Sequence, residues 1–156
     1  MLTAGIDEAG RGCIFGPVFA AAVIWDDEIT HKLLRDSKKL SAKQRNVVYD
    51  FVLDNAIDYG IASIDARIID SVNILNATYT AMHSALDDLA LDIDSILVDG
   101  NSFRYYTDKE DNIVPHMCVV SGDSIHKSIM AASILAKVSH DRYVDEQSPK
   151  NPEYNL

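Results

Sequence analysis

Four acidic residues stand apart from the other acids because each follows an apolar stretch of strand length. They are Asp7 and Glu8 after LTAGI, Asp99 after SILV, and Asp123 after MCVVSG. Most of the 24 acidic residues have polar neighbours, as in Asp26-Asp27-Glu28, and a solvated surface position explains them. A carboxylate at the end of a buried strand loses hydration, so it needs a compensating charge.

The chemistry of these four acids favours a hard divalent cation. Arg11 is one of few bases nearby in the sequence, so a cation from solution is the natural compensator. Carboxylates without Cys or His partners select Mg²⁺ or Mn²⁺. Two such ions about 3.5–4 Å apart can activate a water and stabilise the leaving oxygen of a phosphodiester. The pattern indicates metal-dependent phosphoryl transfer, and ordinary turn acids at strand ends are the alternative.

Apolar runs and helical periodicity predict the elements that would position these acids. Strands are expected at 2–6, 18–25, 59–64, 95–98 and 117–120. Helices are expected at 42–53, behind Ser41 as N-cap, at 73–91, with Tyr79, Met82 and Leu86 on its apolar face, and at 124–144. This order predicts an α/β fold with a mixed sheet flanked by helices, in one domain over 1–156. Residues 105–114 are expected to form a local hairpin or loop without an assigned role.

The net charge of −10 at first argues against a nucleic-acid partner, because phosphate binding depends on Lys and Arg. The charge is unevenly distributed, however. Residues 51–100 contain one base and nine acids, whereas residues 32–45 contain six bases opposed only by Asp36. A solvated helix face explains such a run, and it is also where a phosphate backbone would bind.

Composition excludes several other classes of protein. No apolar run approaches the roughly 20 residues that cross a bilayer, and residues 1–6 lack the features of a signal peptide. We therefore expect a cytoplasmic protein without a membrane partner. Cys13 and Cys118 are too few for a disulfide scaffold or a cysteine-based zinc site.

Six ordered blocks of sequence resemble the type 2 ribonuclease H family. The first joins GIDEAGRG at 5–12 to GPVFAAAVI at 16–24. The others are DSKKLS at 36–41, NILNAT at 73–78, LVDGN at 97–101, SGDS at 121–124 and AASILAKVSHDR at 131–142. A lone DEAG would be weak, but blocks in the family's order with similar spacing cover nearly the whole chain.

The resemblance implies the ribonuclease H-like fold, a five-stranded mixed sheet with helices on both sides. It implies an endonuclease that hydrolyses the RNA strand of RNA–DNA hybrids and cuts at ribonucleotides embedded in duplex DNA, with Mg²⁺ or Mn²⁺. Its catalytic metal ligands map onto Asp7, Glu8, Asp99 and Asp123, the same four acids. The substrate-binding residues it implies are Gly10, Arg11 and Gly12 at the ribose 2′-hydroxyl, Ser37, Lys38 and Lys39 at phosphates, and Ser133 and Lys137 at the DNA strand.

Departures from the family pattern leave alternatives open. Ser121 stands where lysine is common, and Asp141 is expected either beside the site or paired with Lys137 on a helix. The sequence ends where relatives continue into a Lys-Gly-Tyr block whose tyrosine stacks on the substrate. A shortened, weakly active metal- and hybrid-binding form is therefore one alternative, and a resolvase- or transposase-like nuclease is another. The protein is expected to be a monomer unless the short end drives self-association.

Overall fold

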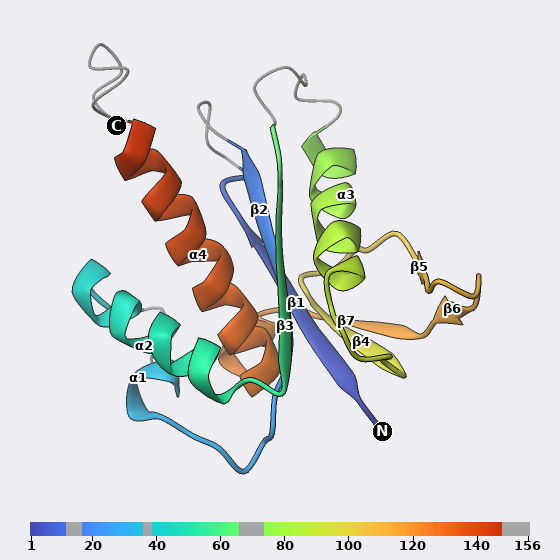
Figure 1. Ribbon diagram of the computed structural model, residues 1–156, viewed down its shortest axis with the longest axis horizontal. Helices are drawn as coiled ribbons and strands as arrows, with labels where there is room; N and C mark the ends of the chain where they lie inside the picture. Colours follow the sequence, from blue (N-terminus) through green and yellow to red (C-terminus); the bar gives the residue numbers. More distant parts are fainter. Residues whose placement is uncertain (12–16, 36–38, 66–73, 148–156) are drawn as a thin grey trace.

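A five-stranded mixed sheet forms the centre of the protein in the computed structural model, which describes residues 1–11, 17–35, 39–65 and 74–147 (Figure 1). Its strands are β1 (Thr3–Ala9), β2 (Val18–Ile24), β3 (Asp58–Ile64), β4 (Ser95–Asp99) and β7 (His116–Val119). They lie in the order β3-β2-β1-β4-β7. β2 is antiparallel to β1 and β3, whereas β4 is parallel to β1 and β7. The predicted mixed sheet is confirmed.

Helices cover both faces of the sheet (Figure 1). They are α1 (Lys32–Arg35), α2 (Ala42–Asn55), α3 (Ile74–Asp87) and α4 (Lys127–Gln147). α3 lies on one face, and α4 lies on the other with α2 outside it. A hairpin of β5 (Tyr106–Thr107) and β6 (Ile113–Val114) confirms the expected hairpin in 105–114. Among the described residues, no helix is long and apolar enough to cross a membrane.

Strand β2 is buried on both faces, which explains its continuous apolar sequence. Alternate residues of a strand point to opposite faces. Ala20 and Ala22 accordingly belong to the core under α3, whereas Ala21 and Val23 belong to the core under α2 and α4. Alternate side chains of this one strand thus belong to the two cores, one on each face of the sheet.

The buried face of helix α3 contains smaller side chains than its apolar spacing predicts. Met82 and Leu86 are buried as expected, but Tyr79 is only half-buried. The buried face consists of Ala77, Thr78, Ala81, Met82, Ala85 and Leu86. Small side chains allow the helix to lie close to the sheet, so close packing outweighed the size of the apolar side chains.

Helix α2 begins at Ala42, as predicted, because Ser41 forms a capping box. The Ser41 hydroxyl accepts a hydrogen bond from the Gln44 amide at 3.2 Å, and the Gln44 side chain accepts one from the Ser41 amide at 3.0 Å. These bonds satisfy backbone donors that a helix start otherwise leaves unpaired. The cap therefore fixes where α2 begins, and Arg45 lies in its first turn.

Two of the differences from the expected element boundaries bear on the acidic residues. β1 continues to Ala9 because its backbone pairs with β2 as far as Phe19, so Asp7 and Glu8 lie within the strand rather than after it. A 3₁₀ turn, η2 (Gly122–Ser124), precedes α4, which begins at Lys127 instead of Ser124. Asp123 is therefore in the turn that connects the sheet to α4.

Candidate active site

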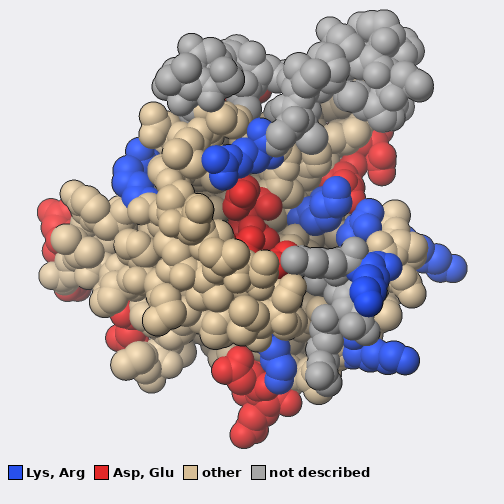
Figure 2. All heavy atoms as spheres, turned by 180° about the vertical axis from the view of Figure 1, so that it is seen from behind, with Lys and Arg blue, Asp and Glu red and all other residues tan. Residues whose placement is uncertain are grey.

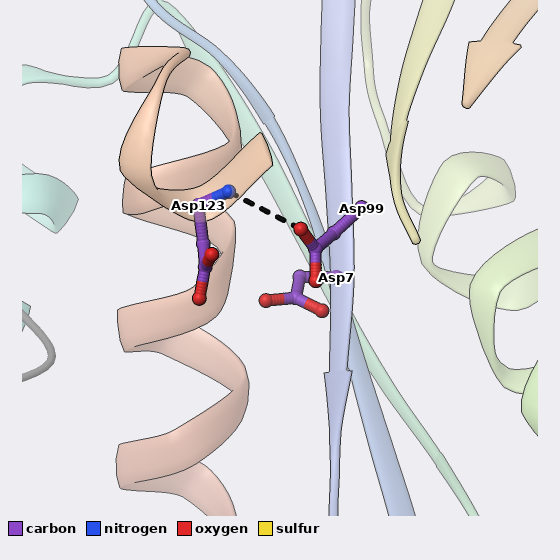
Figure 3. Close-up of side chains that lie close together, drawn as sticks. All are labelled: Asp7, Asp99 and Asp123. Atoms are coloured by element: carbon purple, nitrogen blue, oxygen red, sulfur yellow. Dashed lines mark hydrogen bonds between the residues drawn. The ribbon is translucent and has the colours of Figure 1, made fainter. Parts of the chain in front are cut away.

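Three of the four predicted acids converge where β1 and β4 approach the start of α4. Asp7 lies on β1, Asp99 ends β4, and Asp123 lies in η2. One carboxylate oxygen of each lies within 4.8 Å of one oxygen of both others (Figure 3). β1 and β4 are parallel neighbours, which brings acids near the ends of both strands to the same edge of the sheet.

Side chains pack closely around the turn that carries Asp123. A Cβ on Gly122 would lie 2.7 Å from Cδ1 of Ile129 and 3.4 Å from Oδ1 of Asp99. A side chain here would have to displace the end of Ile129, so the space at this position favours glycine. The amide of Asp123 donates a hydrogen bond of 3.2 Å to Oδ1 of Asp99, which ties the turn to the end of β4. The preceding residue, Ser121, has φ 56°, the left-handed conformation that such a tight turn demands.

Glycine on β1 brings the start of α4 against the same strand. A Cβ on Gly5 would lie 2.5 Å from the carbonyl carbon of Ser128 in the first turn of α4. Any larger residue would push the helix away. Gly5 and Gly122 together therefore place Asp123 near Asp7, although 116 positions separate the two acids in the sequence (123 minus 7).

Among the described residues, burial and the charges of neighbouring acids dominate the electrostatics of Asp7. Only 5% of the residue is exposed. Burial raises its pKa well above the ordinary value, and the charges of Glu8 and Asp99 raise it further, against a backbone hydrogen bond from Glu8 that lowers it. Three acids supplying only oxygen ligands fit a hard divalent cation, which would remove this repulsion.

Glu8, the fourth predicted ligand, lies beside this cluster rather than within its 4.8 Å set. Burial raises the pKa of the Glu8 carboxyl, while a hydrogen bond with Asp7 and the charge of Arg11 lower it. Glu8 is thus coupled to Asp7 electrostatically. It also lines a neighbouring hollow, so it connects the acidic cluster to the region where a substrate could lie.

A hollow of about 340 Å³ adjoins the cluster between the end of β1, α2 and α4. Its walls are Glu8, Ala9, Gly10, Arg45, Ser133, Ile134 and Lys137. Figure 2 shows acidic side chains in a hollowed part of the surface, with basic side chains around them. The structure therefore brings three predicted substrate residues, Gly10, Ser133 and Lys137, to one surface.

The glycine at position 10 is required by both conformation and space. Its φ is +87°, and a Cβ there would lie 2.5 Å from Cδ2 of His140. His140 is buried, and burial lowers the pKa of its imidazole, in keeping with a structural histidine. Arg11 and Lys39 are exposed. Gly12, Ser37 and Lys38 lie outside the described residues, so their predicted roles stay predictions.

Arg45 is the charged residue of the hollow for which the sequence predicted no individual role. The sequence placed it only within the basic run at 32–45, for which a solvated helix face is the usual explanation. The structure gives it a place in the wall, together with Lys137. Its position one turn after the predicted N-cap was the available signal. The predicted pairing of Lys137 with Asp141 is confirmed, with Nζ 3.4 Å from Oδ1.

Known proteins resemble this chain over almost all of its length. The family model described as Ribonuclease HII matches residues 4–156. The ribonuclease HII of Christiangramia forsetii is 47% identical over 97% of this chain and 74% of its own. That of Cytophaga hutchinsonii is 46% identical over 98% of this chain and 74% of its own.

A solved structure agrees with the sequence matches. The crystal structure of ribonuclease H2 from Pyrococcus horikoshii is 26% identical, with a TM-score of 0.78 over 99% of this chain and 79% of the other. The likeness of fold and sequence extends across the acidic cluster and the hollow. On these matches the chain belongs to the ribonuclease HII family and is a hydrolase of the ribonuclease H type, a class that uses divalent metal.

Proposed function

We propose that this chain hydrolyses the RNA strand of RNA–DNA hybrids and cuts duplex DNA at embedded ribonucleotides, at Asp7, Glu8, Asp99 and Asp123. The observation that supports this most is the convergence of three carboxylates, one of them buried, beside a hollow lined by bases. A polyanionic substrate bound in the hollow would lie next to the acids. The overall charge of −10 is then compatible with such a substrate, because the bases are local to the site.

The four acids are proposed to hold Mg²⁺ or Mn²⁺. The raised pKa of Asp7 supports the fit, because a bound cation would favour the ionised carboxylate that burial disfavours. Two such ions would supply an activated water and charge stabilisation for the leaving oxygen of a phosphodiester. The acids themselves fix the coordination positions, and the backbone bond from Asp123 to Asp99 keeps two of them in register.

Recognition of RNA is proposed for the segment after the acids on β1. Gly10, Arg11 and Gly12 would read the ribose 2′-hydroxyl, the group that separates RNA from DNA. The wall position of Gly10 supports this, since a residue without a side chain lets a sugar approach the backbone. Ser37, Lys38 and Lys39 are proposed to contact phosphates, and Ser133 and Lys137 to contact the DNA strand.

The direct test compares three labelled substrates with the full chain. These are an RNA–DNA hybrid, a DNA duplex with one ribonucleotide, and the same duplex without it, each with Mg²⁺, Mn²⁺ or EDTA. We expect metal-dependent cleavage of the first two only. Equal cleavage of the all-DNA duplex would favour the resolvase- or transposase-like alternative. Metal binding without cleavage of any substrate would favour the weakly active form.

A further inference from the structure

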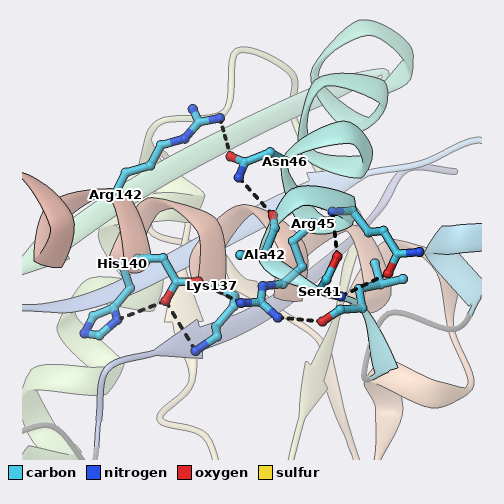
Figure 4. A network of polar contacts seen from close by, with 10 residues as sticks. Ser41, Ala42, Arg45, Asn46, Lys137, His140 and Arg142 are labelled. Carbon is cyan, nitrogen blue, oxygen red and sulfur yellow. Dashed lines mark hydrogen bonds and ion pairs between the residues drawn. The ribbon is translucent and has the colours of Figure 1, made fainter.

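Asp141 on α4 connects basic residues from two helices. Its Oδ2 lies 3.3 Å from Nη2 of Arg45 on α2, and its Oδ1 lies 3.4 Å from Nζ of Lys137 on α4. Nδ1 of His140 lies 4.0 Å from the same Oδ1. Figure 4 shows Arg45 and Lys137 entering one network of polar contacts from these two helices. One carboxylate therefore fixes the relative positions of two cations.

Arg45 is anchored at a second point. Its Nη1 donates a hydrogen bond of 2.8 Å to the carbonyl oxygen of Leu40, just before the cap of α2. Its Nε is buried and has no hydrogen-bond partner in the part of the chain that the structure describes. The guanidinium is thus held between the segment before α2 and the carboxylate on α4, with a donor still unused.

The two cations line the hollow, but the acid that holds them is not among its lining residues. The side chains of Arg45, Asp141 and Lys137 are 22%, 33% and 50% exposed. A long lysine side chain at such exposure samples many rotamers unless a partner holds it. By charge alone, an acid near a phosphate site would weaken binding. The contacts of Asp141 therefore point to a role in ordering the bases.

We propose that Asp141 is a positioning residue for nucleic-acid binding, holding Lys137 and Arg45 so that both face a backbone phosphate of the substrate in the hollow. The inference rests on the proposed function. By its charge alone Asp141 would weaken the binding of a polyanionic substrate, whereas in this proposal it strengthens that binding. Loss of the carboxylate should weaken substrate binding even though the protein becomes less negative.

The test is a double-mutant cycle on cleavage of an RNA–DNA hybrid by the full chain. Asp141→Asn, Lys137→Ala and the double variant are compared with the unaltered protein for KM and kcat. Asp145→Asn is the matched control, because Asp145 is exposed one turn later on α4 and makes no ion pair with the described residues. Thermal unfolding checks that each variant folds, and Asp141→Ser replaces the asparagine variant if that one does not.

We expect Asp141→Asn to raise KM about three- to fivefold, the range of a partly exposed ion pair, with kcat changed by less than about twofold. In the Lys137→Ala background, its effect should fall to less than half, because one of its two partners is gone. Asp145→Asn should leave KM unchanged or slightly lower.

Three results would overturn the inference: an unchanged or lower KM for Asp141→Asn, a loss confined to kcat, or full additivity with Lys137→Ala. The restoring variant is Asp141→Glu, which keeps the carboxylate and should return KM to within about twofold of the unaltered protein. A KM as high as that of Asp141→Asn would also contradict it. Failure of the proposed function is distinct, since the unaltered protein would then not cut the hybrid at all.

Discussion

The acidic cluster and the interface between α2 and α4 differ in how their charged groups are surrounded. At the cluster, Asp7, Asp99 and Asp123 bring like charges within 4.8 Å, and burial and repulsion raise the pKa of Asp7. At the helix interface, charged groups meet complementary partners. Arg142, for example, donates a hydrogen bond of 2.9 Å to Asn46 and lies 4.2 Å from the centre of the Tyr49 ring.

This difference distinguishes two kinds of region. The acidic cluster needs a cation from solution to balance its charge, whereas the polar groups between α2 and α4 find partners within the chain. Paired polar groups stabilise a fold and give no reason to look for a ligand. Buried like charges cost stability unless a cation binds, so they persist where function requires them. The hollow lies between the two regions, which is why Lys137 and Arg45 both pair with Asp141 and line the hollow.

The largest effect is expected when an acid of the cluster is neutralised. Asp99→Asn should lower the rate of hybrid cleavage by at least about a hundredfold, because it removes a ligand to ions that contribute several kcal/mol to the transition state. Steady-state cleavage in Mg²⁺ or Mn²⁺ measures this. Asp92→Asn, at an exposed position, is the control and should retain full activity. Retention of more than about a tenth of the rate by Asp99→Asn would reject the assignment.

Divalent ions should stabilise the cluster without affecting the paired interface. Binding to the folded state alone contributes about 2.7 kcal/mol at a hundred times the dissociation constant, or a rise of about 5–11 °C in Tm for a chain of this size. Thermal unfolding with millimolar Mn²⁺, Mg²⁺ or EDTA gives the shift. It should shrink in Asp99→Asn and persist in Arg142→Ala. Absence of a shift with any ion would mean that the acids do not form a metal site.

The pH dependence of stability in the metal-free protein tests whether Asp7 is uncompensated. A carboxyl whose pKa is raised by folding contributes stability below its ordinary pKa of 3.8, and that contribution is lost as the pH rises through the folded value. Asp7→Asn should therefore raise Tm in EDTA near neutral pH, by about 2–4 °C for each kcal/mol recovered.

The two proteins should converge below the ordinary pKa of Asp7, where both carry an uncharged side chain. Exposed Asp92→Asn should change Tm little at any pH. An Asp7→Asn variant that is less stable than the unaltered protein in EDTA near neutral pH would show that the carboxylate is compensated by the chain itself.

The smallest effect is expected at the paired interface. Arg142→Ala removes an exposed hydrogen bond and a contact with the Tyr49 ring, so it should cost about 0.5–1 kcal/mol and lower Tm by about 1–4 °C. KM for the hybrid should not change, since Arg142 does not line the hollow. Arg142→Lys keeps the charge and should recover part of the loss. A change in KM comparable to that of Asp141→Asn would remove the distinction between the two regions.

The sequence by itself determined the order of elements and the identity of the acids. Strand-length apolar runs predicted β2, β3 and β4 to within two residues, because the positions of a strand that face a core are restricted to apolar residue types. Ser41 and Gln44 specified the start of α2 through contacts only three residues apart. Asp7, Asp99 and Asp123 were identifiable because charges rarely follow apolar strands without a reason.

Only the tertiary structure decided which of these residues meet. That Glu8 lies beside the tight set, and that Arg45 and Lys137 line the same hollow, depends on packing between elements distant in the sequence. The close approach of α4 to β1 depends on the absence of a side chain at Gly5, and the packing of Ile129 against η2 is tightest at Gly122. The pairing of Arg45 with Asp141 spans 96 positions. Local sequence cannot specify such contacts, because the register between a helix and a strand is fixed by the whole core that packs them together.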